Sequence, residues 1–274
     1  MIDPAERRAL EVVDVGWSTT IQDLGRPGLA HLGVTAAGAI DPGLAALVNR
    51  LVGNDERAAV LETAGGLAVR PTGPVLVATT AELAPRLLAV GEPLAIVSDD
   101  VHTWSYVAVR GGISVDPVLG SRSHDTLSGI GPAPISAGMR LAVGVDPATP
   151  ITVDVAQRRP GPSRIRLWPG PRADWFDAAS SARLTDGEWI VETVSRVGLR
   201  LAGTSMHRVV SDELPSEGLV AGAIQVPHDG QPVVMLADHP TTGGYPVIAV
   251  VEPDDLAALA QRRVGSIVRF RPAR

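Results

Sequence analysis

The sequence predicts a mostly β protein made of two β-barrel domains with a few short helices. Many short runs rich in β-branched residues are bounded by Gly, Pro or Asp, which is typical of barrels and sandwiches. The 29 glycines and 23 prolines are spread along the chain without a period, which favours many turns. A stretch rich in Pro and short polar residues, 145–164, separates two halves of ordinary domain size. We therefore expect domains at 1–155 and 163–274.

The expected strands share β-branched and aromatic residues and end at turn-forming residues. In chain order they are EVVDVG, PVLVATT, PLAIVS, WSYVAVRGG, RIRLW, EWIVETV, GAIQVP, PVVMLAD, YPVIAVVE and SIVRFRP. Both halves of the chain contain such runs, an early helix and a Gly-rich loop near the end. This shared order favours two related domains.

Three segments are predicted to be helical. The first begins at Asp41 as N-cap, has Pro42 at the first helical position, and stops at Gly53. The second covers 171–184. The third covers 253–265, with acids near its start and arginines in its last turn, as the helix dipole favours.

Two residue types are missing, and each absence excludes a class of chemistry. The chain has no cysteine, which excludes disulfides, thiolate catalysis and cysteine-ligated metals. It also has no lysine, because all 24 basic residues are arginine. A Walker-A loop, a Schiff-base lysine and a covalently attached biotin are therefore excluded.

The charge and hydropathy patterns point to a cytoplasmic protein. The net charge is −6 and the pI is about 5.5, so a general nucleic-acid surface is not expected. No apolar run approaches the ~18 residues that a membrane span needs, and the first ten residues contain no apolar signal region. We expect no contact with membranes or nucleic acids.

Residues 19–41 form the first candidate for a functional segment. Asp23, Arg26 and His31 lie among many Gly and Pro residues, so we expect a loop rather than a regular strand. Asp23 and His31 are candidates for acid–base catalysis, and Arg26 for binding an anion. The alternative is that Asp23 and Arg26 brace a long loop while His31 caps a barrel end.

Residues 109–126 form the second candidate. Arg110 precedes two glycines, and Arg122 lies beside Ser123. Guanidinium groups, a hydroxyl and backbone amides suit an oxyanion such as phosphate or carboxylate. An exposed polar turn is the alternative. The adjacent Ser, His and Asp at 123–125 do not make a catalytic triad, because a triad must converge in space.

Residues 216–246 form the third candidate. The turn at 228–232 joins two expected strands, and Asp238 ends the second of them. A strand that delivers an acid to a Gly-rich hydroxyl loop can build a ligand mouth, so Asp238 is the third catalytic candidate. The alternative is a bulged barrel corner. The expected binding residues here are Gln225, Thr241, Thr242, Gly243, Gly244 and Tyr245.

A protein-ligated metal is not predicted. The six histidines are scattered and show none of the spacings typical of zinc sites.

Five segments together resemble one known family. They are TTIQDLGRPGLAHLGV, AVRGGISVDPVLGSRS, WPGPRADWF, SEGLVAGAIQVPHDGQPVVMLAD and TTGGYP, and the resemblance runs from about Val12 to about Phe270. The family is that of the 5-oxoprolinase C subunit. It is also known as allophanate hydrolase subunit 2, as the biotin-dependent carboxyltransferase family, and as an antagonist of a sporulation-kinase inhibitor.

The resemblance implies a fold, partners and a co-substrate. The fold would be two cyclophilin-like β-barrels. The chain would work with the 5-oxoprolinase B subunit, also called allophanate hydrolase subunit 1, as a heterodimer or heterotetramer. With a third, lactam-utilisation subunit, the complex would open 5-oxoproline to glutamate while hydrolysing ATP with Mg²⁺. The B and C subunits would phosphorylate the lactam and the third subunit would hydrolyse it.

One departure from the resemblance concerns substrate choice. We expect Arg-Gln before the two threonines, whereas this chain has His239 and Pro240. Two rival functions stay open. The chain could serve a carboxyltransferase or allophanate hydrolase system like urea amidolyase, with carboxybiotin supplied from elsewhere. It could also be a non-catalytic regulator that binds a kinase-inhibitor homologue.

Overall fold

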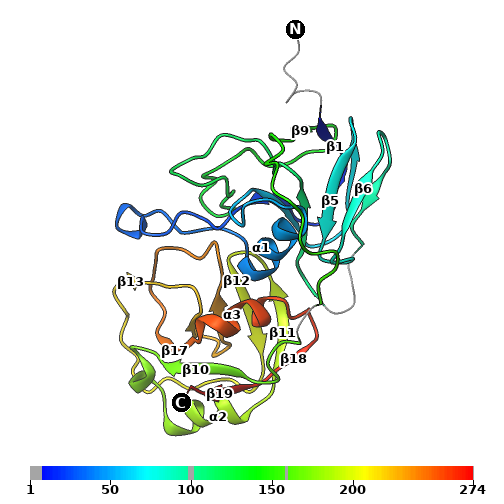
Figure 1. The fold of residues 1–274 in the computed structure, drawn as a ribbon. Helices are drawn as coiled ribbons and strands as arrows, with labels where there is room; N and C mark the ends of the chain where they lie inside the picture. Colours follow the sequence, from blue (N-terminus) through cyan, green and yellow to red (C-terminus); the bar gives the residue numbers. More distant parts are fainter. Residues whose placement is uncertain (1–7, 98–101, 158–159, 274) are drawn as a thin grey trace. The chain divides into compact units, whose positions relative to one another are not determined.

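The computed structural model describes residues 8–97, 102–157 and 160–273 and divides the chain into two units (Figure 1). Unit 1 contains residues 1–26, 37–125 and 129–159, and unit 2 contains 27–36, 126–128 and 160–274. The main division lies within the Pro-rich stretch of the sequence. Two short segments of the N-terminal half, 27–36 and 126–128, group with unit 2, which the sequence did not predict.

In its described residues, unit 1 has two antiparallel sheets and one helix. The sheets have the strand orders β7-β4-β1-β9 and β2-β3-β8-β5-β6. The elements are β1 (Ala9–Val15), β2 (Thr19–Gln22), α1 (Pro42–Leu51), β3 (Val60–Thr63), β4 (Leu67–Pro71), β5 (Val75–Thr79), β6 (Pro85–Leu88), β7 (Leu94–Ala95), β8 (Ser105–Val109) and β9 (Arg140–Ala142).

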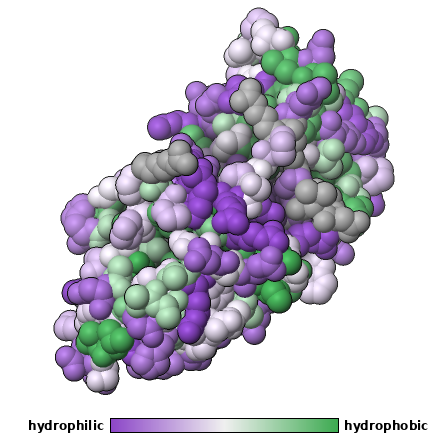
Figure 2. All heavy atoms as spheres, turned by 90° about the horizontal axis from the view of Figure 1, so that it is seen from below, coloured by the Kyte–Doolittle hydropathy of each residue, from purple (hydrophilic) through white to green (hydrophobic). Residues whose placement is uncertain are grey.

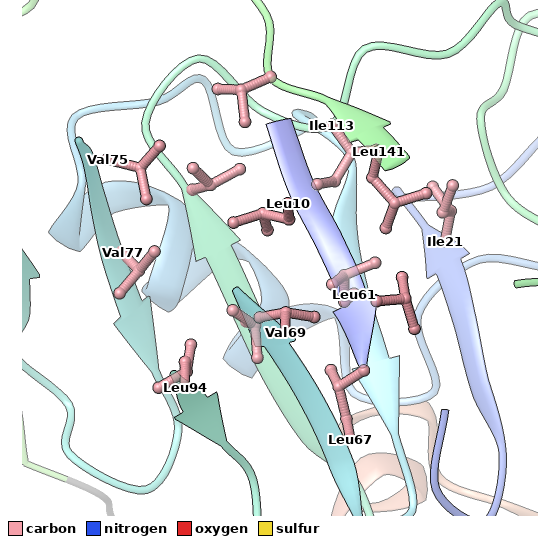
Figure 3. Close-up of a cluster of buried hydrophobic side chains, with 14 of the residues drawn as sticks. Leu10, Ile21, Leu61, Leu67, Val69, Val75, Val77, Leu94, Ile113 and Leu141 are labelled. Carbon is pink, nitrogen blue, oxygen red and sulfur yellow. The ribbon is translucent and has the colours of Figure 1, made fainter. Parts of the chain in front are cut away.

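The core of unit 1 is aliphatic and contains side chains from both sheets (Figure 3). Leu10 and Val69 belong to the four-stranded sheet, and Leu61 and Val77 belong to the five-stranded sheet. All four are fully buried. Because strand side chains alternate between faces, each sheet gives one face to this core. Helix α1 packs against β8 and β5.

Unit 2 is built on one eight-stranded sheet with the order β18-β11-β12-β15-β14-β17-β10-β19. Its only parallel neighbours among the described strands are β10 and β19. The strands are β10 (Ile165–Pro169), β11 (Trp189–Val194), β12 (Gly198–Ala202), β14 (Ala223–Gln225), β15 (Val233–Met235), β17 (Val247–Val251), β18 (Ile267–Val268) and β19 (Phe270–Pro272). The prediction of a mostly β chain with a few short helices is confirmed.

The remaining described elements of unit 2 are a short ribbon and several helical segments. A two-stranded ribbon pairs β13 (Glu217–Gly218) with β16 (Thr242–Gly243). The helical elements are η2 (Ala30–Leu32), η3 (Ala173–Trp175), α2 (Ala178–Asp186) and α3 (Pro253–Ala260). Helix α2 packs against β19, and α3 packs against β10. Among the residues described, no helix has both the length and the hydropathy needed to cross a membrane.

The three predicted helices exist, with changed limits. The first spans Pro42–Leu51, and the carboxylate of Asp41 accepts a hydrogen bond from the Leu44 amide at 3.0 Å, as expected for an N-cap. The second segment splits into η3 and α2, because Asp177 starts a new helix by accepting from the Ser180 amide at 2.6 Å. The third ends at Ala260.

One strand contradicts the prediction of a loop over 19–41. Residues Thr19–Gln22 form β2 and pair in register with β3. The sequence TTIQ contains three β-branched residues, a local preference for strand that the neighbouring Gly and Pro residues concealed. Strand β2 therefore delivers Asp23 at its end, just as β15 is followed by Asp238 in unit 2.

Candidate functional site

Asp23 is the centre of a buried hydrogen-bond network in unit 1. The residue is 7% exposed. It accepts bonds from the hydroxyls of Ser121 at 2.5 Å and Ser123 at 2.6 Å. It also accepts from the amides of Gly25 at 2.8 Å and Arg122 at 2.6 Å. The carboxylate therefore fastens the loop after β2 to residues 121–123, and both of its oxygens are engaged.

Arg26 and Arg122 lie beside this network but are held differently. Arg26 is 3% exposed, and its guanidinium donates to the carbonyls of Ser123 and Val118. Arg122 is half-buried and donates through Nε to the carbonyl of Val115 at 2.8 Å. The two terminal nitrogens of Arg122 make no hydrogen bond to any residue that the structure describes. These nitrogens of Arg122 are therefore available to bind an oxyanion.

Arg110 has a structural environment elsewhere in unit 1. It pairs with Asp146 at 2.8 Å. Its two terminal nitrogens donate to the carbonyls of Val52 and Thr149, both at 2.9 Å. Every nitrogen of this guanidinium is thus used to join the end of α1 to residues 146–149. These contacts do not favour the predicted role of Arg110 in binding phosphate.

Ser123 and His31 also have local partners. Ser123 is fully buried, donates to Asp23 and accepts from the Asp23 amide at 3.0 Å. His31 is exposed in η2, and its Nδ1 lies 3.1 Å from the carbonyl of Gly28. Both hydrogen bonds of the Ser123 hydroxyl hold Asp23 in place. An acid–base role for His31 stays a prediction.

Asp238 forms a buried ion pair with Arg196 in unit 2. The side chains are 0% and 1% exposed, and two parallel hydrogen bonds of 2.8 Å join them. The amide and hydroxyl of Thr126 donate to the same carboxylate at 2.9 and 2.7 Å. The pair thereby holds residues 126–128 in unit 2. These contacts are those of a structural ion pair and do not favour the predicted catalytic role of Asp238.

The Gly-rich loop 241–245 combines fixed backbone with accessible hydroxyls. Strand β16 pairs with β13, and the carbonyl of Thr241 accepts from the Leu219 amide at 2.9 Å. The amide of Gln225, which is 5% exposed, donates to the carbonyl of Tyr245 at 3.0 Å. Gln225 therefore holds the backbone of the loop, and its contact with a ligand stays a prediction.

The exposed side of this loop retains the predicted binding groups. Thr242 and Gly244 are exposed, and the hydroxyls of Thr241 and Thr242 make no hydrogen bond to the described residues. Tyr245 is 40% exposed, and its ring meets that of His228 edge-on with centroids 5.7 Å apart. These groups can hydrogen-bond and wall a small polar molecule.

His239 departs from the expected Arg-Gln pair and is 8% exposed. Its Nδ1 lies 2.7 Å from the carbonyl of Pro240, so the ring folds back on its own chain. The long, positively charged side chain that we expected is therefore replaced by a compact ring before the loop.

Unit 1 also contains a buried carboxylate, Glu62, that was not among the predicted site residues. Glu62 is 0% exposed and accepts from the hydroxyl of Tyr106 and the amide of Ile40, at 2.7 and 2.8 Å. Burial raises the pKa of Tyr106 well above its ordinary value of 10.0, and the neighbouring carboxylates of Glu62 and Asp41 raise it further. A single Glu within a strand of apolar residues was the only signal in the sequence.

The predicted site residues thus fall into separate groups. Asp23, Arg26, Arg122 and Ser123 share one network in unit 1, and Arg110 has other partners. In unit 2, Gln225 holds the Gly-rich loop, Asp238 pairs with Arg196, and His31 contacts Gly28. Convergence of the groups on one ligand stays a prediction. Among the described residues, no three His, Asp or Glu side chains are placed to share a metal ion.

Comparison with known proteins identifies relatives over nearly the whole chain. The family model "Carboxyltransferase domain, subdomain A and B" matches residues 32–272. The chain is 36% identical to the 5-oxoprolinase C subunit of Escherichia coli, over 95% of this chain and 90% of that protein. It is 27% identical to urea amidolyase of Lachancea kluyveri, over 96% of this chain and only 17% of that protein.

A solved structure agrees with the fold. The crystal structure of TTHA0988 superposes with a TM-score of 0.86 at 32% identity, covering 99% of this chain. This chain spans 57% of that solved chain. The match of the family model and the identity to the relative from E. coli extend across both units. This chain therefore belongs to the family of the carboxyltransferase domain, subdomain A and B.

Proposed function

We propose that this chain is the C subunit of a cytoplasmic, ATP-dependent 5-oxoprolinase that opens 5-oxoproline to glutamate. The supporting observation is the 36% identity to the 5-oxoprolinase C subunit of E. coli, which covers 90% of that protein. The relative named urea amidolyase is less similar and far longer than this chain. The partners would be a homologue of the B subunit and a third, lactam-utilisation subunit.

The groups described above suit the chemistry of lactam activation. A five-membered lactam is a stable amide, and ATP, when bound, supplies the phosphoryl group that turns the lactam oxygen into a leaving group. The terminal nitrogens of Arg122 would hold phosphate oxygens, because a guanidinium binds them through two parallel hydrogen bonds. Mg²⁺ would be held by the phosphates of ATP, since it prefers hard oxygen ligands.

The exposed face of the Gly-rich loop would position the lactam. Thr241 and Thr242 offer hydroxyls that can donate to the lactam oxygen or accept from its N–H. Tyr245 would cover one side of the ring. Asp23 and Gln225 would act as positioning residues, because each holds a loop that carries these groups.

The decisive experiment is purification of the chain with its B-subunit homologue and measurement of ADP release. Release that depends on 5-oxoproline supports the proposal. Activity only with a biotinylated carrier protein and urea would instead support the carboxyltransferase function that the urea amidolyase relative suggests. A complex that shows neither ADP release with any lactam or small amide nor activity with the biotinylated carrier contradicts both functions and leaves the regulator as the remaining alternative.

A variant can test the role of Arg122 in the same assay. Arg122→Gln should raise the KM for ATP or the lactam by about tenfold or more, since a charge-assisted bidentate contact is lost. Arg70→Gln is the matched control, because Arg70 is an exposed residue of β4 and its loss changes the charge of unit 1 equally. Equal kinetics for the two variants would remove Arg122 from the site.

A further inference from the structure

Two arginines flank one tryptophan in unit 2, outside the groups discussed so far. The guanidinium carbon of Arg172 lies 5.7 Å from the centre of the Trp175 ring, and that of Arg208 lies 5.3 Å from it. Both distances are within the range of cation–π attraction. Trp175 and Arg208 are half-buried, so the group lies at the surface with restricted side chains.

Backbone hydrogen bonds fix all three residues. The amide of Val209 donates to the carbonyl of Trp175 at 2.9 Å, and Phe176 forms an antiparallel bridge with Arg208. The amide of Arg172 donates to the carbonyl of Val247 in β17 at 3.0 Å. The backbone positions from which the two arginines extend are thus set by the sheet and η3, which contributes to the preorganisation that a binding site needs.

The two arginines differ in how their donors are used. Arg172 forms an ion pair with Glu217 through two hydrogen bonds, so its charge is neutralised locally. Among the residues that the structure describes, the side chain of Arg208 makes a single hydrogen bond, from Nη2 to the carbonyl of Asp212 at 3.2 Å. Its Nε is buried and has no partner among the described residues.

Within the described part of the chain, Arg208 therefore has unused donors and no carboxylate partner. A guanidinium has five N–H groups in a fixed fork, and burial of an unsatisfied one is unfavourable. An oxyanion is the ligand that satisfies such a fork, because it accepts two parallel charge-assisted bonds. The flat indole beside it can contact the apolar part of the same molecule.

The group is connected to the Gly-rich loop through Glu217. Glu217 belongs to β13, which pairs residue by residue with β16: Glu217 is opposite Gly243, and Gly218 is opposite Thr242. The ion pair of Arg172 with Glu217 therefore ties the arginine–tryptophan group to the ribbon that carries the exposed threonine hydroxyl. The arginine–tryptophan group and the ribbon therefore belong to one connected part of unit 2.

We infer that Arg208, with Trp175 as its wall, is a binding site for a small oxyanion, and that Arg172 positions the indole. The anion would be the carboxylate of the lactam substrate or a phosphate group. Only the identity of the lactam depends on the proposed function. Binding of an anion by the isolated chain can be measured without turnover, so failure of this inference and failure of the proposed function are distinguishable.

The test is a titration of the full chain by calorimetry and tryptophan fluorescence, with three separate probes. Inorganic phosphate and 5-oxoproline represent the two sources of the anion. The third probe, 2-pyrrolidinone, has the same lactam ring without the carboxylate. Saturable binding of phosphate or 5-oxoproline, without binding of 2-pyrrolidinone, is the expected result. Whichever anion saturates identifies the source.

Variants connect the binding to the residues. Arg208→Gln should weaken the binding by about tenfold or more, and Arg208→Lys should weaken it less, because lysine keeps the charge but loses the fork. Arg269→Gln is the matched control, since Arg269 pairs with Glu188 at the surface of the same unit. Trp175→Phe should abolish the fluorescence change, whereas Trp168→Phe, at an exposed tryptophan of β10, should keep it.

The inference is overturned if neither anion binds saturably to the chain. It is also overturned if Arg208→Gln and Arg269→Gln bind the anion equally well while both melt as the parent does. If Arg208→Gln fails to fold, Arg208→Lys provides the comparison: unchanged affinity together with unchanged melting would contradict the role of the guanidinium fork.

Discussion

At the scale of single residues, the two predicted catalytic aspartates, Asp23 and Asp238, accept hydrogen bonds that hold distant segments of the chain together. Asp23 and Asp238 both follow a strand, both are buried, and both gather donors from a segment distant in the sequence. A carboxylate whose oxygens are engaged in this way stabilises a loop junction. The burial makes each acid hard to replace, because removal leaves its donors without partners.

The pair of Asp238 and Arg196 gives a direct prediction about stability. Asp238→Ala should lower the free energy of unfolding by about 3–5 kcal/mol, because it leaves the buried charge of Arg196 uncompensated. Urea denaturation of the purified chain measures this loss. Glu188→Ala, in a pair whose acid is 55% exposed, should cost less than about 1 kcal/mol and serves as control. Equal losses for the two variants would contradict the buried pair.

Tyr106 gives a prediction about pH. Its folded-state pKa is raised above 10.0, mainly by burial, so its contribution to stability is complete below pH 10 and is lost as the pH rises towards the folded pKa. Unfolding free energies measured across this range should fall by up to about 1.4 kcal/mol per pH unit more in the parent than in Tyr106→Phe. The same slope in both proteins would show that Tyr106 ionises freely in the folded state.

At the scale of elements, the Gly-rich loop depends on the glycine that faces inward. A methyl group on Gly243 would lie 2.6 Å from the amide nitrogen of Gln225 and 2.8 Å from Leu219, whereas one on Gly244 would meet only a carbonyl oxygen at 3.6 Å. The side chains of Gln225 and Leu219 therefore leave no room for a side chain at Gly243, whereas Gly244 has room for one.

Gly243→Ala should lower the free energy of unfolding by about 1–3 kcal/mol, as overpacking of a filled site does. Its KM for the lactam should also rise, since the hydrogen bond from Gln225 that holds the loop is disturbed. Gly244→Ala is the matched control and should be close to the parent in both measurements. Loss of stability in Gly244→Ala alone would reverse our assignment of the inner and outer glycine.

The elements that the sequence predicts best are those with local signals. Helix α1 has a capping Asp, a Pro at its first position and a Gly after its end, and it forms almost as expected. Strand β2 was missed because its four residues are followed by Gly and Pro, although TTIQ itself favours a strand. The start of α2 at Asp177 depends on one cap inside a longer helical pattern.

The partners of the candidate residues could not be predicted, because they come from distant positions. Arg196 carries no motif, yet it is the partner of Asp238 across 42 positions. Ser121 and Asp23 are separated by 98 positions. Sequence spacing reports periodicity along an element, whereas these contacts depend on how strands are ordered in the sheets. The same limit applies to Arg172, Trp175 and Arg208, which no sequence signal joined.

At the scale of the whole molecule, several large hydrophobic side chains of unit 1 are exposed. Trp17, Val97 and Val145 are 86%, 77% and 80% exposed. Trp17 and Val97 are close in unit 1, because the amide of Trp17 donates to Gly65 and the next amide, of Gly66, donates to Ile96. The face in Figure 2 shows hydrophobic residues in small groups among hydrophilic ones.

The proposed complex with a B-subunit homologue therefore makes a prediction about stability. A partner that binds only the folded chain stabilises it by about 2.7 kcal/mol when its free concentration is 100 times the Kd. The Tm of this chain should rise with the concentration of that homologue, as measured by a thermal scan of the mixture.

Trp17→Ser should reduce the rise, because a large exposed indole is a typical anchor of an interface. The exposed Trp168→Ser in unit 2 is the control. A Tm that is independent of the partner contradicts the complex, whereas an equal rise in both variants places the contact away from Trp17.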